Sequence, residues 1–344
     1  MVEQHVRVGL RLALLAALGP VRNLHPAAGF PPRVTIGPGF RDLARVSGKR
    51  DDAVIPWGKN DSEMTLRIAT LNIWNKAGPW PERLGLIRRE LGELGPDVLG
   101  LQEVLRMTTP GAAPDAASCQ ATEICHGLPY EIAYAPAMHY GGGLHFGNAV
   151  CSRWPIRHVA HFPLPGADSS EARVLLHARV ETPHGVLPVF VTHLNWKLHH
   201  GSIRLEQVRF IVDTLFEHCP VDDGQLPPVL MGDFNAGPES DEIRYLSGHA
   251  TVEGKSVYFA DAWVHAGDGP GYTFDRKNRF AALAHEPPRR IDYVFVRGPD
   301  RQLRGEPLST RLAFASSEPA AGGLLWPSDH FGVVTDLAAS PRSA

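Results

Sequence analysis

Short apolar stretches that end in polar side chains recur along this chain, and they constrain its fold more than any other feature. The clearest is the run 229–236, in which Asp233 and Asn235 follow residues suited to a strand. Because successive side chains of a strand alternate between its faces, these two polar groups point to the same side. A carboxylate that takes a proton from water, beside a carboxamide that holds the same water, suits hydrolysis. Asp and Asn are also common turn residues after a strand, so this stretch alone does not decide the matter.

Other stretches of the same kind supply further candidate groups. Three of them deliver Asn72, Gln102 with Glu103, and His193 with Asn195. Two C-terminal segments carry Asp292 and the pair Asp329-His330. A lone carboxylate such as Glu103 could hold a hard divalent cation through oxygen. Each group also has a structural interpretation, since Asn72 could close a strand end and His330 could be a satisfied core histidine. Asp292 could likewise form a cross-strand ion pair with Arg290.

Helical periodicity alternates with these strand-like stretches. Apolar residues at three- to four-residue spacing predict helices at 81–94, 203–216 and, more briefly, 239–246. Apolar runs between Gly and Pro turns predict strands at 147–152, 173–180 and 187–192. The alternation predicts an α/β protein, but it does not distinguish one α/β fold from another.

Taken in order, the motifs resemble those of a known enzyme superfamily. They are Leu71-Asn72, Gln102-Glu103, the Gly-Asp-Phe-Asn run 232–235, the Arg-Ile-Asp-Tyr run 290–293 and Ser328-Asp329-His330. The chain is similar, from about residue 64 to 337, to the endonuclease/exonuclease/phosphatase superfamily of metal-dependent phosphoesterases, which includes exonuclease III, deoxyribonuclease and neutral sphingomyelinase. The resemblance implies an α/β (α+β) fold, a four-layer α/β/β/α sandwich of two packed mixed β-sheets, with the site at the mouth where strands end.

The resemblance also implies the metal side of the site. Glu103 would contact the metal directly, Asn72 would act through hydrogen bonds around it, and Asp329 would assist. Mg²⁺ fits such a site because it prefers oxygen ligands and keeps several waters, and Mn²⁺ would also fit. A bound cation would neutralise charge that develops on phosphoryl oxygens.

The other implied roles concern proton transfer. Asp233 would be the general base, and Asn235 would orient the nucleophile or a phosphate oxygen. His330 would donate a hydrogen bond or a proton to the phosphoryl group, while Asp292 would hold its imidazole in the required tautomer. His193 matches the second histidine of the deoxyribonuclease and sphingomyelinase branches, which argues against abasic-site repair.

Two loops are predicted to shape the substrate pocket. The glycine-rich stretch 140–148 carries Asn148, and the stretch 271–279 mixes aromatic and basic residues, among them Tyr272 and Arg276. The first could equally be an ordinary hairpin turn and the second an exposed loop. Further predicted substrate contacts follow the His193 strand, at Asn195 and Trp196.

Charge favours a small or lipid-like phosphate ester over long nucleic acid. The net charge is −3, so the chain has no general attraction to polyanions. A nuclease, the main alternative, would require Arg276, Lys277, Arg279, Arg289 and Arg290 to form one basic stripe. A catalytically silent binding module on the same scaffold is a second alternative, which the full set of motifs disfavours.

The cysteines and the N-terminal region add limited information. Buried or surface thiols are a better interpretation of Cys119 and Cys125 than a zinc site with His126, because the spacing is poor and a fourth ligand is missing. We expect residues 1–62 to be a disordered extension or no part of the fold, 63–338 to be the catalytic domain and 339–344 to be a tail. Translation could start at Met1 or Met64.

No apolar run reaches the roughly 20 residues of a membrane span. We expect a cytoplasmic protein, and a monomer. The short apolar stretch 9–19 would make it secreted if it served as a signal peptide, although Arg11 interrupts that stretch.

Overall fold

The computed structural model describes residues 64–108, 118–166, 170–220 and 224–341. The predicted extension 1–62 lies outside the described residues, as do 342–344 of the predicted tail. The predicted domain 63–338 is described from Met64, with short gaps.

A mixed sheet of seven strands forms one half of the described fold. Its order is β12 (Pro307–Ala313), β15 (Gly332–Ala338), β1 (Thr65–Asn72), β2 (Val98–Met107), β5 (Leu144–Ser152) and β4 (Glu131–Gly141), with β3 (Ser118–Cys119) also paired to β2. Strands β1 and β2 run parallel, whereas the β1–β15 and β2–β5 pairs are antiparallel.

A second mixed sheet of six strands packs against the first. Its order is β10 (Ala260–Asp261), β11 (Asp292–Val296), β9 (Val229–Asp233), β8 (Gly185–His193), β7 (Val174–Thr182) and β6 (Ile156–Pro163). Here β8 and β9 are parallel and the other neighbours are antiparallel. A separate hairpin joins β13 (Glu318–Ala320) and β14 (Gly323–Leu325).

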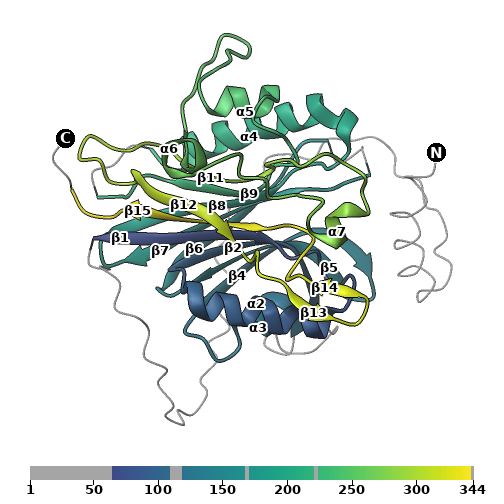
Figure 1. Cartoon of the computed structure of the whole chain (residues 1–344). Helices are drawn as coiled ribbons and strands as arrows, with labels where there is room; N and C mark the ends of the chain where they lie inside the picture. The colour runs from purple at the N-terminus through teal and green to yellow at the C-terminus, as the bar shows by residue number, and fades with distance from the viewer. Residues whose placement is uncertain (1–63, 109–117, 167–169, 221–223, 342–344) are drawn as a thin grey trace. The chain divides into compact units, whose positions relative to one another are not determined.

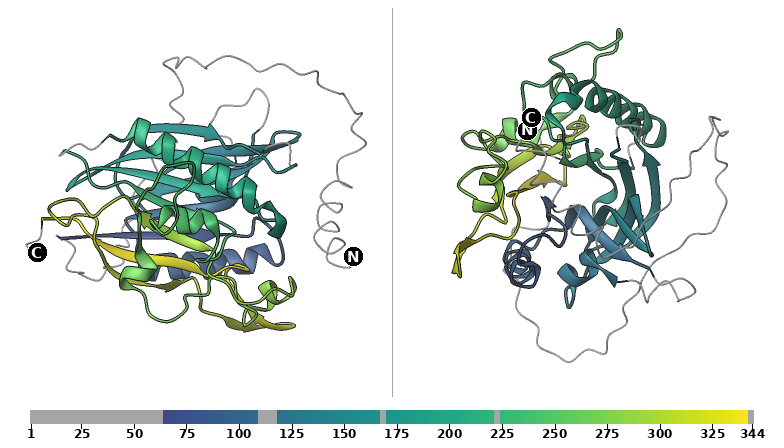
Figure 2. Two further views of the ribbon diagram at one scale, coloured as in Figure 1. Left: turned by 90° about the horizontal axis from the view of Figure 1, so that it is seen from above. Right: turned by 90° about the vertical axis from the view of Figure 1, so that its right-hand side faces the viewer.

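Helices cover the outer faces of both sheets (Figure 1). On the seven-stranded sheet these are α2 (Trp80–Leu94) and α3 (Gln120–Cys125); on the six-stranded sheet they are α4 (Gly201–His218) and α5 (Asp241–Leu246). Figure 2 shows α4 from above, lying across the strands of its sheet. The connections contain the short helices η3 (Leu198–His200), α6 (Ala262–Ala266) and α7 (Arg279–Ala282). The predicted four-layer sandwich is confirmed.

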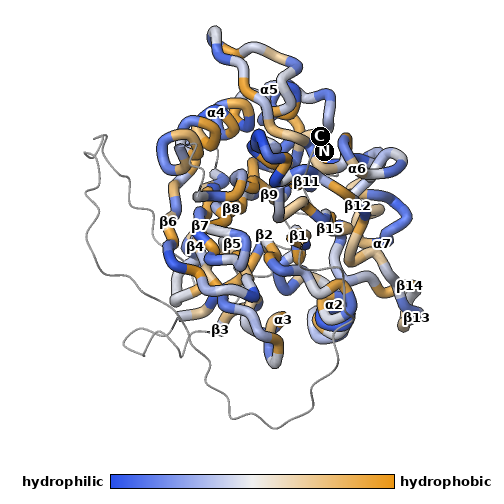
Figure 3. Tube along the Cα trace, turned by 90° about the vertical axis from the view of Figure 1, so that its left-hand side faces the viewer, coloured by the Kyte–Doolittle hydropathy of each residue, from blue (hydrophilic) through white to orange (hydrophobic). Residues whose placement is uncertain are grey.

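Three apolar layers hold the sandwich together, and the alternation of side chains along β1 shows why. Ile68 faces the core between the sheets, where it joins Val191 and Met231. Its neighbours Ala69 and Leu71 pack on the α2 and α3 side. Figure 3 looks at the ends of the strands and shows that hydrophobic segments are frequent in the central strands of the two sheets. Burying both faces of a sheet explains why these strands read as nearly continuous apolar runs.

The helices match their predicted positions within a few residues. The predicted ranges 81–94, 203–216 and 239–246 correspond to α2, α4 and α5. Helix α5 starts at Asp241, two residues later than predicted, with Ser240 at the N-cap position in an extended conformation. Among the described residues, no helix combines the length and apolarity that a membrane crossing needs.

The cysteines are free thiols, and of the two predicted possibilities, buried or surface, the structure shows the buried one. This holds for Cys119, Cys125, Cys151 and Cys219. Among the described residues, the side chains placed to hold a metal ion are Asp233, Asp292 and His330, and Cys119, Cys125 and His126 form no such group. The zinc interpretation therefore receives no support.

Candidate active site

Strand ends from both sheets meet at one point. Asp233 closes β9, and in the sheet it pairs with His193 at the end of β8 and with Asp292 at the start of β11. Asn72 closes β1 of the other sheet, and His330 comes two residues before β15. The structure thus brings together all of the predicted proton-transfer groups in one buried cluster.

The carboxylate of Asp233 is at the centre of this cluster and is 1% exposed. Its Oδ2 accepts a hydrogen bond from Asn72 Nδ2 at 3.0 Å and lies 3.4 Å from His193 Nε2 and 3.8 Å from His330 Nε2. Its Oδ1 accepts from the backbone N–H of Asn235 at 2.8 Å. Burial raises the pKa of Asp233, and the nearby Asp292 raises it further, while His330 opposes both. A raised pKa suits a group that takes up a proton near neutral pH.

Gly232 allows Asp233 to lie this close to the β8 strand. Its φ of +140° is one that residues with side chains rarely adopt, and a Cβ here would lie 2.0 Å from the carbonyl oxygen of Thr192. The glycine of the Gly-Asp-Phe-Asn motif is therefore required by the close approach of two parallel strands. Asn235, with φ +52°, then turns the chain, and its Nδ2 donates to the Leu194 carbonyl at 3.1 Å.

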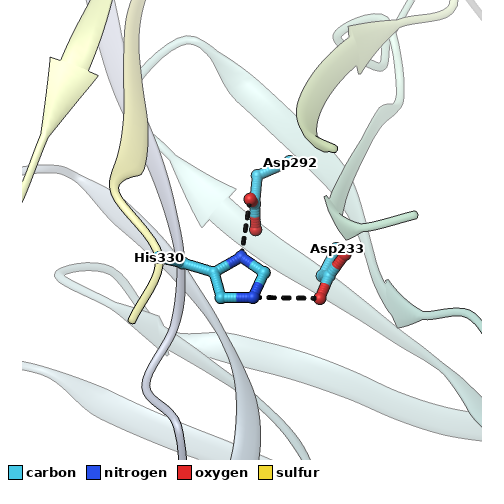
Figure 4. A group of neighbouring side chains, drawn as sticks. All are labelled: Asp233, Asp292 and His330. Carbon is cyan, nitrogen blue, oxygen red and sulfur yellow. Dashed lines mark hydrogen bonds and ion pairs between the residues drawn. The ribbon is translucent and has the colours of Figure 1, made fainter. Parts of the chain in front are cut away.

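His330 and Asp292 form a close pair (Figure 4). The Nδ1 of His330 donates to Asp292 Oδ2 at 2.9 Å, and its Nε2 faces Asp233. Burial lowers the pKa of His330, but Asp292, Asp233 and Asp329 together outweigh it and raise the pKa to about 10. The imidazole is therefore a cation at neutral pH.

Glu103 reaches the site through a β-bulge. The β2–β5 register shifts between Leu101 and Val104, and Glu103 takes the left-handed conformation at φ +60°. The carboxylate accepts hydrogen bonds from Asn72 Nδ2 at 3.4 Å and from Asn75 Nδ2 at 2.8 Å. Asn72 thus connects Glu103 to Asp233, in line with its predicted role in the hydrogen bonds around a metal.

Two groups of side chains could hold a divalent cation. Asp233, Asp292 and His330 offer ligand atoms within 4.8 Å of one another. Both ring nitrogens of His330 already face carboxylates, Nδ1 that of Asp292 at 2.9 Å and Nε2 that of Asp233 at 3.8 Å. Glu103 and Asp329, whose charges both act on Arg83, are the better fit, because carboxylate oxygens are the ligands that Mg²⁺ prefers.

The predicted substrate contacts occupy different surroundings. Asn148 is buried, and its Nδ2 donates to the Val174 carbonyl at 3.0 Å. Asn195 is fully buried, and its Oδ1 accepts from Gln207 Nε2 at 2.7 Å. Both amides therefore form hydrogen bonds within the protein that stabilise the fold. Trp196 is partly exposed.

The 271–279 loop divides into an exposed and an anchored part. Tyr272 and Arg276 are exposed. Thr273 is buried, and its Oγ1 accepts the backbone N–H of Asp292 at 3.1 Å. The ring of Phe274 lies 5.1 Å from that of His330. The loop predicted to bind substrate is therefore also a support for the His330–Asp292 pair.

The basic stripe that a nuclease would need is not formed. Arg290 is buried and bonded to Asp261 at 2.7 Å, so it is not the ion-pair partner of Asp292. Arg289 pairs with Glu286, and Arg279 donates to the Gly322 carbonyl. Of the five cations considered, Arg276 and Lys277 are the exposed ones.

Several residues at the site were not predicted from the sequence. Arg83, in α2, is fully buried and donates to backbone carbonyls of two separate segments, at Ile73, Trp74, Asn75, Ala77 and Pro327. Burial lowers the pKa of Arg83 to about 10, while Asp329 and Glu103 oppose that shift. A signal was present, since Arg83 precedes Ile87 by four residues and thus shares the apolar face of the helix.

Two further residues contact the site through His193. Arg173 NH1 lies 3.0 Å from His193 Nδ1, and Glu171 pairs with Arg173 at 3.4 Å. Both side chains are buried. No local pattern marks them, because they meet His193 only when β7 and β8 pair.

The comparisons with known structures agree with this fold. TDP2 from Caenorhabditis elegans shares 18% identity over 80% of this chain and 75% of its own, with a TM-score of 0.58. The catalytic domain of human Nocturnin, solved with a bound sulfate anion, shares 19% over 80% and 94%, with a TM-score of 0.57. A protein titled endonuclease/exonuclease/phosphatase from Beutenbergia cavernae shares 24% over 80% and 72%, with a TM-score of 0.57. At these identities the likeness shows the fold.

A comparison with curated proteins gave no match. The sequence profile described as "Endonuclease/Exonuclease/phosphatase family" matches residues 69–330, most of the chain. That range includes the whole cluster, from Asn72 to His330. The chain therefore belongs to the endonuclease/exonuclease/phosphatase family, which includes metal-dependent phosphoesterases and nucleases.

Proposed function

We propose that the protein is a Mg²⁺-dependent hydrolase of phosphate esters, a phosphodiesterase or phosphatase. The observation that carries this proposal is the buried carboxylate of Asp233 between two histidine Nε2 atoms, at 3.4 and 3.8 Å. A base flanked by two groups that can donate hydrogen bonds suits attack of water on phosphorus, because the donors can stabilise the phosphoryl oxygens.

In this proposal Asp233 takes the proton of the attacking water. Its raised pKa favours proton uptake, and the Asn235 N–H keeps its Oδ1 in place. With its Nδ2 bonded to the Leu194 carbonyl, Asn235 would orient the water through its Oδ1. His330 would donate from Nε2 to a phosphoryl or leaving-group oxygen, while Asp292 holds its Nδ1–H.

A divalent cation would be held by Glu103 with Asp329, while Asn72 and Asn75 fix the Glu103 carboxylate. When bound, it would supply positive charge opposite the developing negative charge on phosphorus-bound oxygens. The donor atoms are oxygens, which favours Mg²⁺ or Mn²⁺ over Zn²⁺.

A small or lipid-like phosphate ester is the proposed substrate class. The net charge is −3, and the cations considered for a nuclease stripe are largely engaged with other groups. The sulfate bound to human Nocturnin supports the idea that this fold accepts a tetrahedral anion. Exposed Tyr272 and partly exposed Trp196 are proposed to line the pocket with apolar surface.

The test is hydrolysis of a chromogenic phosphodiester with Mg²⁺, with Mn²⁺ and with a chelator. We expect chelation to abolish turnover and Asp233→Ala to lower kcat by roughly 10²- to 10⁴-fold, the usual worth of a positioned base. Asp213→Ala is the matched control, because that carboxylate is exposed on α4 and pairs with Lys255. Full activity under chelation, or an Asp233→Ala enzyme with normal turnover, would contradict the proposal.

A further inference from the structure

The two histidines beside Asp233 have chemically opposite partners. On His330, Nδ1 faces the carboxylate of Asp292 at 2.9 Å. On His193, Nδ1 faces the guanidinium of Arg173 at 3.0 Å. Both Nε2 atoms point toward the same oxygen, Oδ2 of Asp233. The difference therefore lies on the side of each ring that faces away from Asp233.

An arginine partner fixes the tautomer of His193. Guanidinium carries only N–H donors and stays protonated, so the ring nitrogen that it contacts must be an acceptor. Nδ1 of His193 therefore carries no proton, and the single ring proton is on Nε2. The Nε2 atom that carries this proton lies 3.4 Å from Asp233 Oδ2.

The surroundings keep Arg173 in this position. Its side chain is 4% exposed and pairs with Glu171, which is 1% exposed. Glu171 also accepts the backbone N–H of Trp196 at 3.2 Å and lies 3.4 Å from Lys197 Nζ. Because Trp196 and Lys197 follow His193 closely in the chain, one buried carboxylate links the guanidinium to the segment that carries the histidine.

Protonation of His193 is disfavoured for the same reason. Burial lowers the pKa of His193 well below its ordinary value, and the positive charges of Arg173 and His330 lower it further. A proton on Nδ1 would also face a guanidinium N–H at hydrogen-bond distance. The ring cannot accept a proton there without losing its partner.

We infer that Arg173 is a positioning residue that locks His193 as a neutral Nε2–H donor. In the proposed phosphoesterase, on which this inference rests, the two histidines then divide the work. His330 supplies a charged donor that can also give up a proton, and His193 supplies a hydrogen bond of fixed direction to the nucleophile or a phosphoryl oxygen. Arg173 and Glu171 act through His193 and touch no reacting atom.

The tautomer can be observed directly by long-range ¹H–¹⁵N NMR of the full-length protein labelled with ¹⁵N-histidine. His193 is assigned by the loss of its signals in His193→Gln. We expect the neutral Nε2–H pattern in the wild type, and mixed tautomers in Arg173→Met. Arg179→Met, which removes the same charge from β7, is the matched control and should leave the His193 pattern unchanged. An Nδ1–H tautomer in the wild type, or an unchanged pattern in Arg173→Met, overturns the inference.

Kinetics with the chromogenic phosphodiester give the second readout. Gln places its amide N–H₂ about where Nε2–H lies, whereas Asn mimics Nδ1–H. We therefore expect His193→Gln to keep at least tenfold more kcat than His193→Asn, and Arg173→Met to add little to His193→Gln. Arg173→Met alone should lower kcat about tenfold or more with KM nearly unchanged, and Arg173→Lys, which retains a charged donor, should recover part of the loss.

These outcomes separate the inference from the proposed function. An inactive wild type with the Nε2–H tautomer contradicts the phosphoesterase proposal but still supports the inference that Arg173 fixes the tautomer of His193. A normal kcat in an Arg173→Met enzyme whose circular dichroism and thermal unfolding match the wild type would show that Arg173 does not contribute to catalysis. Equal activities of His193→Gln and His193→Asn do the same.

Discussion

His330 and His193 show at the residue scale that a neighbour, not the residue type, decides what a side chain can do. Asp292 holds a proton on Nδ1 of His330, and Arg173 excludes one from Nδ1 of His193. The hydrogen bond at one ring nitrogen decides whether the other ring nitrogen carries a proton. Asp233 is therefore flanked by a cation, His330, and by a neutral donor, His193. A motif containing His at both positions does not encode this asymmetry.

The pH dependence of stability should report the charge of His330. Its pKa is raised from 6.5 to about 10 in the folded protein, so the folded state binds this proton more tightly than the unfolded state. The resulting stabilisation is complete below pH 6.5 and is lost as pH rises toward 10. We expect the free-energy gap between wild type and His330→Asn to shrink over this window by about 1 kcal/mol per pH unit at its steepest.

The measurement is urea unfolding of both proteins with a chelator present. It is made at several pH values from about 6 to about 10, which covers the pKa of His330 in the unfolded and in the folded protein. The chelator removes bound metal ions, so the difference between the two proteins reflects only the protein's own charges. A gap that stays constant across this range would show that His330 is not held as a cation.

His330 and Asp292 should act as one functional unit in catalysis, so that removing either residue has the same effect as removing both. If Asp292 acts only by holding the Nδ1–H of His330, then His330→Ala, Asp292→Ala and the double variant should lose similar amounts of kcat, each about 10²- to 10⁴-fold. The check is a double-mutant cycle on kcat with the chromogenic diester. Losses that multiply would assign Asp292 a separate role.

At the scale of elements, two glycines illustrate how position decides the effect of a methyl group. Gly232 in β9 has no room, because a Cβ would lie 2.0 Å from the Thr192 carbonyl oxygen. Gly92 in α2 has nothing within 4 Å of the corresponding position. The same substitution should therefore have opposite effects in the two elements.

We expect Gly232→Ala to destabilise the protein by about 2 to 5 kcal/mol, through backbone strain and overpacking. Gly92→Ala should stabilise it by about 0.5 to 1 kcal/mol, because alanine loses less backbone entropy in a helix. Thermal unfolding of both variants and the wild type measures the two shifts. A Gly232→Ala protein as stable as the wild type would refute the close approach of β8 and β9.

Helix α2 supports the site through Arg83. Its guanidinium donates to carbonyls on the β1–α2 connection and to Pro327, just before Ser328-Asp329-His330. Lysine has three donors and cannot reproduce the forked contacts. Arg83→Lys should therefore cost about 3 kcal/mol of stability and lower kcat by about tenfold or more, since Asn75 and Asp329 would lose their support.

Arg88→Lys is the control for this helix. Arg88 lies on the outer side of α2 and makes one hydrogen bond, to the His126 carbonyl. Its replacement should change stability by less than about 0.5 kcal/mol. Chemical denaturation and diester hydrolysis of both variants give the comparison, and an Arg83→Lys enzyme indistinguishable from Arg88→Lys would refute the supporting role.

At the scale of the whole molecule, charge should select the substrate. Affinity for duplex DNA comes largely from counterions released by clustered Lys and Arg, and this chain has a net charge of −3. We expect a small or lipid-like ester to be cleaved with a higher kcat/KM than plasmid DNA. A panel of plasmid DNA, single-stranded oligonucleotide, sphingomyelin, an inositol phosphate and the chromogenic diester, assayed with Mg²⁺ and Mn²⁺ at two salt concentrations, decides this. If plasmid DNA is the best substrate and its cleavage collapses at high salt, the protein is a nuclease.

The sequence alone determined the elements and the groups that they present. Apolar periodicity located α2 and α4 within a few residues, because it reflects which face of an element is buried. The sequence motifs also singled out Asp233, Asp292 and His330, which the structure brings together: Asp233 is the last residue of β9, Asp292 is the first residue of β11, and His330 lies just before β15.

Tertiary structure decided how these groups are held and which state they take. The partners of the site residues come from distant positions, Arg83 for the carbonyl of Pro327 and Arg173 for His193. Strand pairing and sheet packing create these contacts, and neither leaves a local periodicity in the sequence. The bulge that turns Glu103 inward depends in the same way on the register between β2 and β5. Chemistry at this site is therefore encoded by residue identity, while protonation and direction are set by packing.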